Sequence, residues 1–128
     1  MKSHNYKLGF RKDKPDTRDF LICKSMPTVK IPRSTDYTIL MTPVRDQGKE
    51  GLSVAFASVS GVKEYQENIK AKKFTELSPS YLYNECKKID GEIETEGTQI
   101  RCAMKVLKKK GVCRETFWPY KTHQKNRS

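Results

Sequence analysis

Four prolines among the first 50 residues, at positions 15, 27, 32 and 43, constrain the fold of this chain more than any other feature. Each proline fixes its own φ angle and removes a backbone donor, so no helical period survives in this stretch. Helices are therefore expected only downstream. The 128 residues divide into an extended, leader-like segment over 1–42, a mainly helical domain over 43–120 and a basic tail over 121–128.

Apolar spacing predicts a long central helix that begins near Ser53. Its buried face is expected to carry five residues, which are Ala55, Val59, Val62, Tyr65 and Ile69. Short strands or docked extended segments are expected before it, at 31–32, at 39–40 and at Val44. The sequence thus places the most buried element of the domain directly after a glycine-containing turn.

Two shorter helices are predicted after the central one. Ser78 and Pro79 suit an N-cap and a first helical position, and the helix that they start has an apolar stripe of Leu82, Cys86 and Ile89. The third helix is expected from about Thr98 to Lys110, with a stripe of Ile100, Ala103, Met104 and Leu107. The predicted class is α+β and mostly helical.

The formal net charge of +11 is concentrated at the two ends of the chain. Residues 1–35 hold nine Lys or Arg against three acids, and residues 100–128 hold nine against one. Aromatic residues do not interleave with these clusters, which favours solvated surface charge over nucleic-acid binding. The absence of a membrane-length apolar run, and of a signal-like run near Met1, favours a cytoplasmic protein with no membrane partner.

Soft metal ligands are few, and none of their spacings is typical of a zinc site. The cysteines and histidines are Cys23, Cys86, Cys102, Cys113, His4 and His123. The sequence predicts no metal and no cofactor. Reduced thiols are favoured, although one or two disulfides stay open.

The run from Val44 to Ala57 is the part of the sequence that suggests chemistry. Gln47 precedes a turn that contains Gly48 and Gly51, and Ser53 falls in the first turn of the predicted central helix. A helix N-terminus supplies free N–H groups and stabilises a developing anion. A side-chain amide six residues upstream can complete an oxyanion hole. Taken alone, a serine at a helix start is far more often a cap.

Three segments together resemble the papain family of cysteine peptidases. Residues 47–56 are similar to the family's Gln-Gly-x-Cys-Gly-Ser-Cys-Trp-Ala-Phe motif. Residues 77–83 resemble its Leu-Ser-x-x-x-Leu helix start, and residues 111–120 its Gly-(Ile/Val)-x-x-Glu-x-x-(Tyr/Trp)-Pro-Tyr segment. The N-terminal Leu8-Gly9-Phe10 and the stretch 15–20 look like the leader of the bacterial, archaeal and viral branch.

The resemblance implies roles for four residues. Gln47 matches the oxyanion-hole glutamine, and Ser53 falls on the catalytic cysteine, so its N–H would be the second oxyanion donor. Gly51 and Gly97 are the candidate substrate-binding residues. Gly97 lies near the glycine segment that pairs with the substrate backbone, although the family's Gly-Gly is not intact here.

The departures from the family imply an inactive chain. A serine hydroxyl at position 53 has a far higher pKa than a cysteine thiol and needs a general base. The family's histidine and asparagine lie in a second, β-rich domain, and His123 does not match that histidine. A fragment, an engineered Cys-to-Ser variant and a natural pseudoenzyme all stay open.

The sequence therefore predicts the helical half of a papain-type peptidase. Its partners would be an extended peptide or protein substrate and a companion C-terminal domain or chain. The apolar face around Val54 and Phe56 and the side chain of Trp118 are expected to meet that companion. The alternative is a non-catalytic interaction module that docks through its basic ends, Lys105–Lys110 and Lys121–Arg127, on an acidic protein or nucleic acid.

Overall fold

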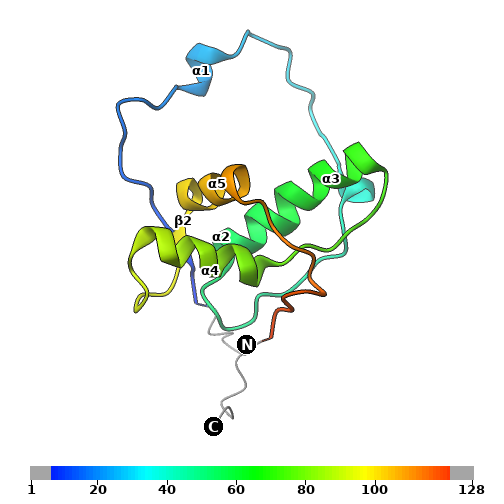
Figure 1. Cartoon of the computed structure of the whole chain (residues 1–128). Coiled ribbons are helices and arrows are strands. Elements are labelled where there is room, and N and C mark those ends of the chain that lie inside the picture. The colour runs from blue at the N-terminus through cyan, green and yellow to red at the C-terminus, as the bar shows by residue number, and fades with distance from the viewer. Residues whose placement is uncertain (1–6, 122–128) are drawn as a thin grey trace, which may run out of the picture.

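The computed structural model describes residues 7–121 and is mostly helical with one small sheet (Figure 1). Its elements in chain order are β1 (Phe10–Arg11), α1 (Ile22–Ser25), η1 (Thr38–Leu40), α2 (Ser53–Phe56), η2 (Ala57–Lys63), α3 (Glu64–Ala71), α4 (Pro79–Asp90), β2 (Thr98–Gln99) and α5 (Ile100–Lys109). The predicted class, α+β and mostly helical, is confirmed. The predicted division at residues 42 and 43 stays a prediction.

The central helix is continuous from Ser53 to Ala71, but its middle third, η2, is a π-helix. Ala55 and Val59 are buried as predicted, whereas Val62 and Ile69 are nearly half exposed and Glu64 and Asn68 are buried in their place. The predicted face is wrong after Val59, because a π-turn takes more residues than an α-turn and rotates everything beyond it.

Helices α4 and α5 pack on the central helix and enclose the core. Helix α4 begins as predicted, since the Ser78 hydroxyl accepts a hydrogen bond from the Tyr81 N–H at 3.1 Å and Pro79 follows the cap. Helix α5 is present and begins two residues after the predicted start near Thr98, because Thr98 and Gln99 form strand β2. Its buried stripe is also rotated from the predicted one and consists of Cys102, Ala103 and Val106.

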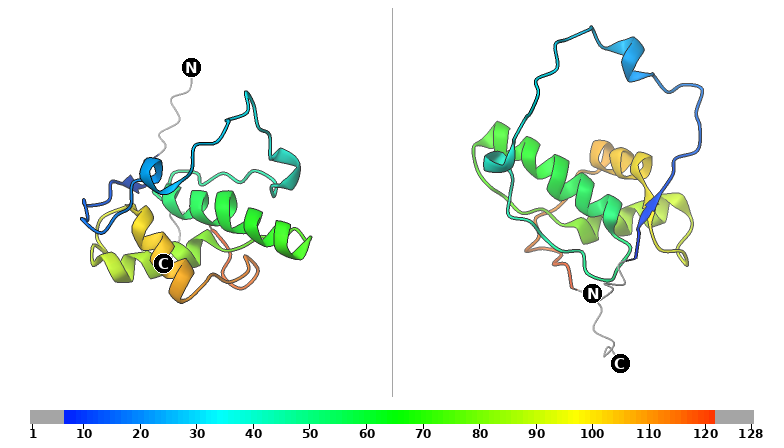
Figure 2. Two further views of the ribbon diagram at one scale, coloured as in Figure 1. Left: turned by 90° about the horizontal axis from the view of Figure 1, so that it is seen from above. Right: turned by 180° about the vertical axis from the view of Figure 1, so that it is seen from behind.

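The N-terminal segment contacts the helical body at its two ends and leaves it in between. Strand β1 pairs in parallel with β2, and the chain then makes a wide loop that carries α1 and returns beside α3 (Figures 1 and 2). The predicted segments are neither strands nor docked, because Thr38–Leu40 forms η1 and the side chains of Ile31, Ile39 and Val44 are all more than 80% exposed. Helix α1 likewise has no buried residue.

The segment after α5 returns to the start of α4. A bridge joins Leu77 to Arg114, and the ring of Tyr120 packs edge-on against Phe56 at 5.0 Å between centroids. Val54 and Phe56 belong to the core of the described residues. Val54 therefore cannot face a companion domain as expected, whereas Phe56 still lines an open cavity.

Candidate active site

Ser53 is the first residue of α2 and is partly exposed. Its N–H lies in the first helical turn, where the helix itself offers no backbone acceptor. Gln47 and Ser53 line one open cavity of about 430 Å³. The predicted nucleophile position and the predicted oxyanion amide are thus brought to the same hollow.

Residues 44–52 form one side of this hollow, here called the Gln47 wall. The Gln47 amide nitrogen donates to the Glu50 carbonyl at 2.8 Å and to the Lys7 carbonyl at 3.3 Å. The turn itself is closed by Asp46, whose carboxylate accepts from the Gly48 N–H at 2.7 Å, and Gly48 takes a φ of 64°. An aspartate and a glycine are the residues that such a turn favours.

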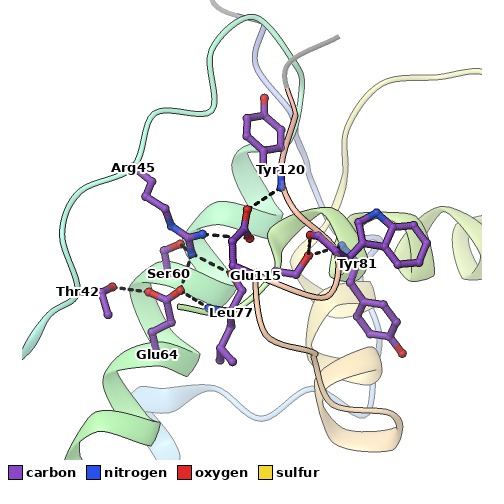
Figure 3. A network of polar contacts seen from close by, with 10 residues as sticks. Thr42, Arg45, Ser60, Glu64, Leu77, Tyr81, Glu115 and Tyr120 are labelled. Atoms are coloured by element: carbon purple, nitrogen blue, oxygen red, sulfur yellow. Dashed lines mark hydrogen bonds and ion pairs between the residues drawn. The ribbon is translucent and has the colours of Figure 1, made fainter. Parts of the chain in front are cut away.

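A largely buried ionic network holds Arg45, and with it the Gln47 wall (Figure 3). The Arg45 guanidinium donates to Glu64, to the Ser60 hydroxyl at 2.7 Å and to the Leu77 carbonyl at 3.0 Å. Glu64 has no exposed surface and also accepts from Thr42 and from the Leu77 N–H. The rotation introduced by η2 is what brings Glu64, rather than an apolar residue, to this position.

The same network reaches Gln47 by a second route. Glu115 pairs with Arg45 at 3.2 Å and accepts from the Tyr120 N–H at 2.6 Å. The Tyr120 hydroxyl in turn donates to the carbonyl of Gln47. Burial raises the pKa of Tyr120 from 10.0 to about 12, so this hydroxyl stays a donor into the alkaline range.

Residues 96–99, here called the Gly97 wall, lie on the other side of Gly9 from the Gln47 wall. Helix α4 holds both main-chain groups of Gly97, because the Tyr83 hydroxyl accepts from its N–H at 3.0 Å and Lys87 donates to its carbonyl at 2.9 Å. Lys87 also pairs with Asp90 at 3.3 Å, and Asp90 accepts from the Thr98 hydroxyl at 3.0 Å. Burial raises the pKa of Tyr83.

The chain's own N-terminal segment lies between the two walls. Gly9 donates its N–H to the Ser53 hydroxyl at 3.2 Å and accepts from the Thr98 N–H at 3.0 Å. Lys7 and Arg11 form ion pairs with Glu96 and Glu92. Residues 7–11 therefore cross the candidate site directly over Ser53.

All four predicted site residues, Gln47, Gly51, Ser53 and Gly97, lie around this crossing. A Cβ on Gly51 would come within 3.2 Å of Glu96, so the two walls meet there. Sequence reasoning missed Gly9, Thr98 and the supporting side chains of Arg45, Glu64 and Lys87. Gly9, Thr98 and Arg45 lie outside the helices, where no spacing marks them, and the charges of Glu64 and Lys87 are typical of surface residues.

Other candidate chemistry is excluded or lies outside the described residues. Burial raises the pKa of Cys86 to about 12 and also raises that of Cys102, so neither is an activated nucleophile. Within residues 7–121, no cluster of three or more His, Cys, Asp or Glu could hold a metal ion. His4, His123 and the tail residues 122–128 lie outside that range.

The alternative of an interaction module that docks through its basic ends stays a prediction. Lys110 is paired with Glu85, whose pKa is lowered by Lys110 and Lys88. No helix among residues 7–121 combines the length and apolar character needed to cross a bilayer.

Comparison with known proteins shows which family this fold and the residues around the site resemble. The family model for papain family cysteine proteases matches residues 31–128. Xylellain, a cysteine protease from Xylella fastidiosa, superposes with a TM-score of 0.65 at 28% identity over 91% of this chain and 44% of its own. The proform of Amb a 11, a cysteine protease and major ragweed pollen allergen, gives 0.63 at 25% identity over 80% and 31%.

No match was found among curated protein sequences. The chain spans less than half the length of the two solved proteases. The match to the family nevertheless covers about three quarters of the chain, and it includes both walls of the site. The chain therefore belongs to the papain family of cysteine proteases.

Proposed function

We propose that this chain is the helical half of a papain-type peptidase, with an extended peptide as the ligand of its candidate site. The observation that carries the proposal is the position of Ser53 at the start of α2, in one cavity with Gln47. The Gln47 amide and the Ser53 N–H are the donors that would stabilise an oxyanion. The two solved relatives at 25% and 28% identity are both cysteine proteases.

The chain as it stands is proposed to be inactive in hydrolysis. Ser53 occupies the nucleophile position, and a serine needs a base to remove its proton during attack. Among residues 7–121 there is no histidine at all. The chain's own residues 7–11 also cover Ser53, so a peptide must displace them before it can reach the hydroxyl.

A companion domain is the proposed source of the base. An open, largely apolar cavity of about 1220 Å³ lies between residues 35–45 and the central helix. Its lining includes Tyr37, Met41, Val44, Tyr65 and Phe74. Val44 and Phe74 are largely exposed, and a second domain packed on this face would bury them.

The variant Ser53→Cys tests the proposal without requiring turnover, and it is made together with Gly9→Ala so that residues 7–11 no longer cover position 53. A peptide aldehyde adds to a thiol to give a tetrahedral oxygen that needs oxyanion donors, whereas iodoacetamide alkylates a thiol without forming one. We expect Gln47→Ala, added to Ser53→Cys, to weaken aldehyde binding about tenfold or more. The same change should leave the iodoacetamide rate at residue 53 unaltered.

The exposed thiol of Cys23 is the internal reference for both reagents. Peptide mapping by mass spectrometry should show that Cys at position 53 reacts with iodoacetamide faster than Cys23 near neutral pH, because the helix N-terminus favours the thiolate. Equal rates at the two positions, or aldehyde binding that ignores Gln47, would overturn the proposed role of the site.

A further inference from the structure

The point where the N-terminal segment crosses Ser53 has no room for a side chain. A Cβ on Gly9 would lie inside van der Waals contact with the Gly51 carbonyl and 2.8 Å from the Ser53 nitrogen. On the other side, the Gly9 carbonyl would lie only 2.7 Å from a Cβ on Gly97. Because the neighbouring atoms at Gly51 and Ser53 are backbone atoms, no change of side-chain rotamer could make space.

Glycine is required at position 9 for space and not for backbone conformation. The glycines with positive φ are Gly48, Gly91, Gly97 and Gly111, and Gly9 is not among them. Any residue could adopt the backbone angles of Gly9, but only a residue without a side chain fits between the walls. The shape of the site therefore selects glycine at this position.

The hydrogen bonds at the crossing use the main chain of the bound segment. The Ser53 hydroxyl and the Thr98 N–H bind the N–H and the carbonyl of Gly9. The two main-chain groups of Gly97 are already held by Tyr83 and Lys87. The Gly97 wall thus pairs with a strand through Thr98. Because these hydrogen bonds use only the main chain of the bound segment, they do not depend on its side chains.

The two side chains next to Gly9 are exposed and contribute little to the choice of peptide sequence. The side chains two residues away on either side contact acidic residues. Leu8 and Phe10 are 88% and 56% exposed. Lys7 and Arg11 pair with Glu96 and Glu92, which belong to the acidic loop between α4 and β2. Alternate residues of a strand share a face, so one acidic loop can contact both positions.

We infer that the channel between Gly51, Ser53, Gly97 and Thr98 is selective for an extended peptide with glycine over Ser53 and basic residues two positions to either side. The chain's own residues 7–11 are its intramolecular ligand. The inference rests on the peptide-binding role proposed for the same site, and it adds the class of peptide that the site accepts.

The test uses the full chain with Gly9→Ala, which removes the chain's own segment from the channel. A labelled peptide that copies residues 7–12 should bind this variant, as measured by fluorescence anisotropy. The same peptide with alanine in place of its glycine should bind at least about tenfold more weakly, since overpacking of this size costs on the order of a tenfold change or more. A peptide with glutamate at both basic positions should bind several-fold more weakly.

Gly61→Ala is the matched control, because a Cβ at Gly61 would meet no atom within 4 Å. This control and the unmodified chain should bind the peptide at least about tenfold more weakly than Gly9→Ala, because their own segment occupies the channel. Amide exchange gives a second reading. The Thr98 N–H should be protected from exchange in Gly61→Ala and in the unmodified chain. It should be exposed in Gly9→Ala and protected again when the peptide is added.

A second variant guards against an unfolded Gly9→Ala chain. Lys7→Glu with Arg11→Glu keeps Gly9 and opens the channel by repulsion from Glu92 and Glu96, so it should bind the same peptide. Equal affinity for the glycine and alanine peptides, or unchanged Thr98 protection in Gly9→Ala, would overturn the inference. Peptide binding requires neither a thiol nor an oxyanion, so glycine-selective binding would stand even if the Ser53→Cys labelling failed.

Discussion

The two walls of the candidate site are each fixed by a cation, partly buried in one case and buried in the other, and the two cations are held in different ways. Arg45, behind the Gln47 wall, finds its partners on α3, on η2, before α4 and after α5. Lys87, behind the Gly97 wall, pairs with Asp90 one helical turn away on α4. The Gln47 wall therefore depends on the assembly of the whole domain, whereas the Gly97 wall depends mainly on one helix.

Removal of Glu64 should lower the free energy of unfolding the most, because Glu64 is the central acceptor of the long-range network. Glu64→Ala leaves the Arg45 guanidinium without its most buried partner, and loss of one member of such a pair costs about 3–5 kcal/mol of unfolding free energy. Urea denaturation followed by circular dichroism measures this loss.

Glu67→Ala is the matched control for Glu64→Ala, since Glu67 pairs with Lys63 on the exposed side of the same helix. That change should cost no more than about 0.5 kcal/mol. Similar losses for the two variants would show that the buried network does not hold the Gln47 wall.

Removal of the Lys87 charge should have a smaller and more local effect. Lys87→Met keeps most of the buried stem but loses the bonds to the Gly97 carbonyl and to Asp90, worth about 1–3 kcal/mol together. Hydrogen exchange should speed up at Gly97 and Thr98, while the amides of the central helix keep their protection.

Lys88→Met is the control for Lys87→Met, because Lys88 is 60% exposed where it pairs with Glu85. It should leave the exchange at Gly97 and Thr98 unchanged. Faster exchange throughout the central helix in Lys87→Met would contradict the local character of the Gly97 wall.

The same contrast explains which parts could be predicted from the sequence. The start of α4 depends on Ser78 and Pro79, which act within one turn, and it was predicted correctly. Gln47 and Ser53 were found because their type and spacing match a family motif, and the structure places them in one cavity. Local signals of this kind are present in the sequence itself.

The parts that failed depend on contacts between distant segments. Val62 was expected inside and is nearly half exposed, because the π-turn of η2 shifts the helical period in a way that regular spacing does not report. Strands β1 and β2 are two residues each and lie 88 positions apart, so neither has a period to detect. Lys87 has the charge of a surface residue, and only tertiary packing brings it to the Gly97 carbonyl, where it supports the Gly97 wall.

Removal of the Tyr120 hydroxyl should have the smallest effect on stability, and this effect should be confined to one hydrogen bond of the Gln47 wall. Tyr120→Phe loses the hydrogen bond to the Gln47 carbonyl, worth about 0.5–1.5 kcal/mol, and leaves the ring packed on Phe56. Because burial raises the folded-state pKa of Tyr120 from 10.0 to about 12, its contribution to stability is complete below pH 10 and is lost as the pH rises toward 12.

An alkaline titration followed by phenolate absorbance measures this. The curve should lose one late-ionising tyrosine in Tyr120→Phe. It should keep that tyrosine in Tyr37→Phe, where the side chain is 55% exposed. Loss of the late step in both variants, or in neither, would mean that the Gln47 wall is not tied to Tyr120.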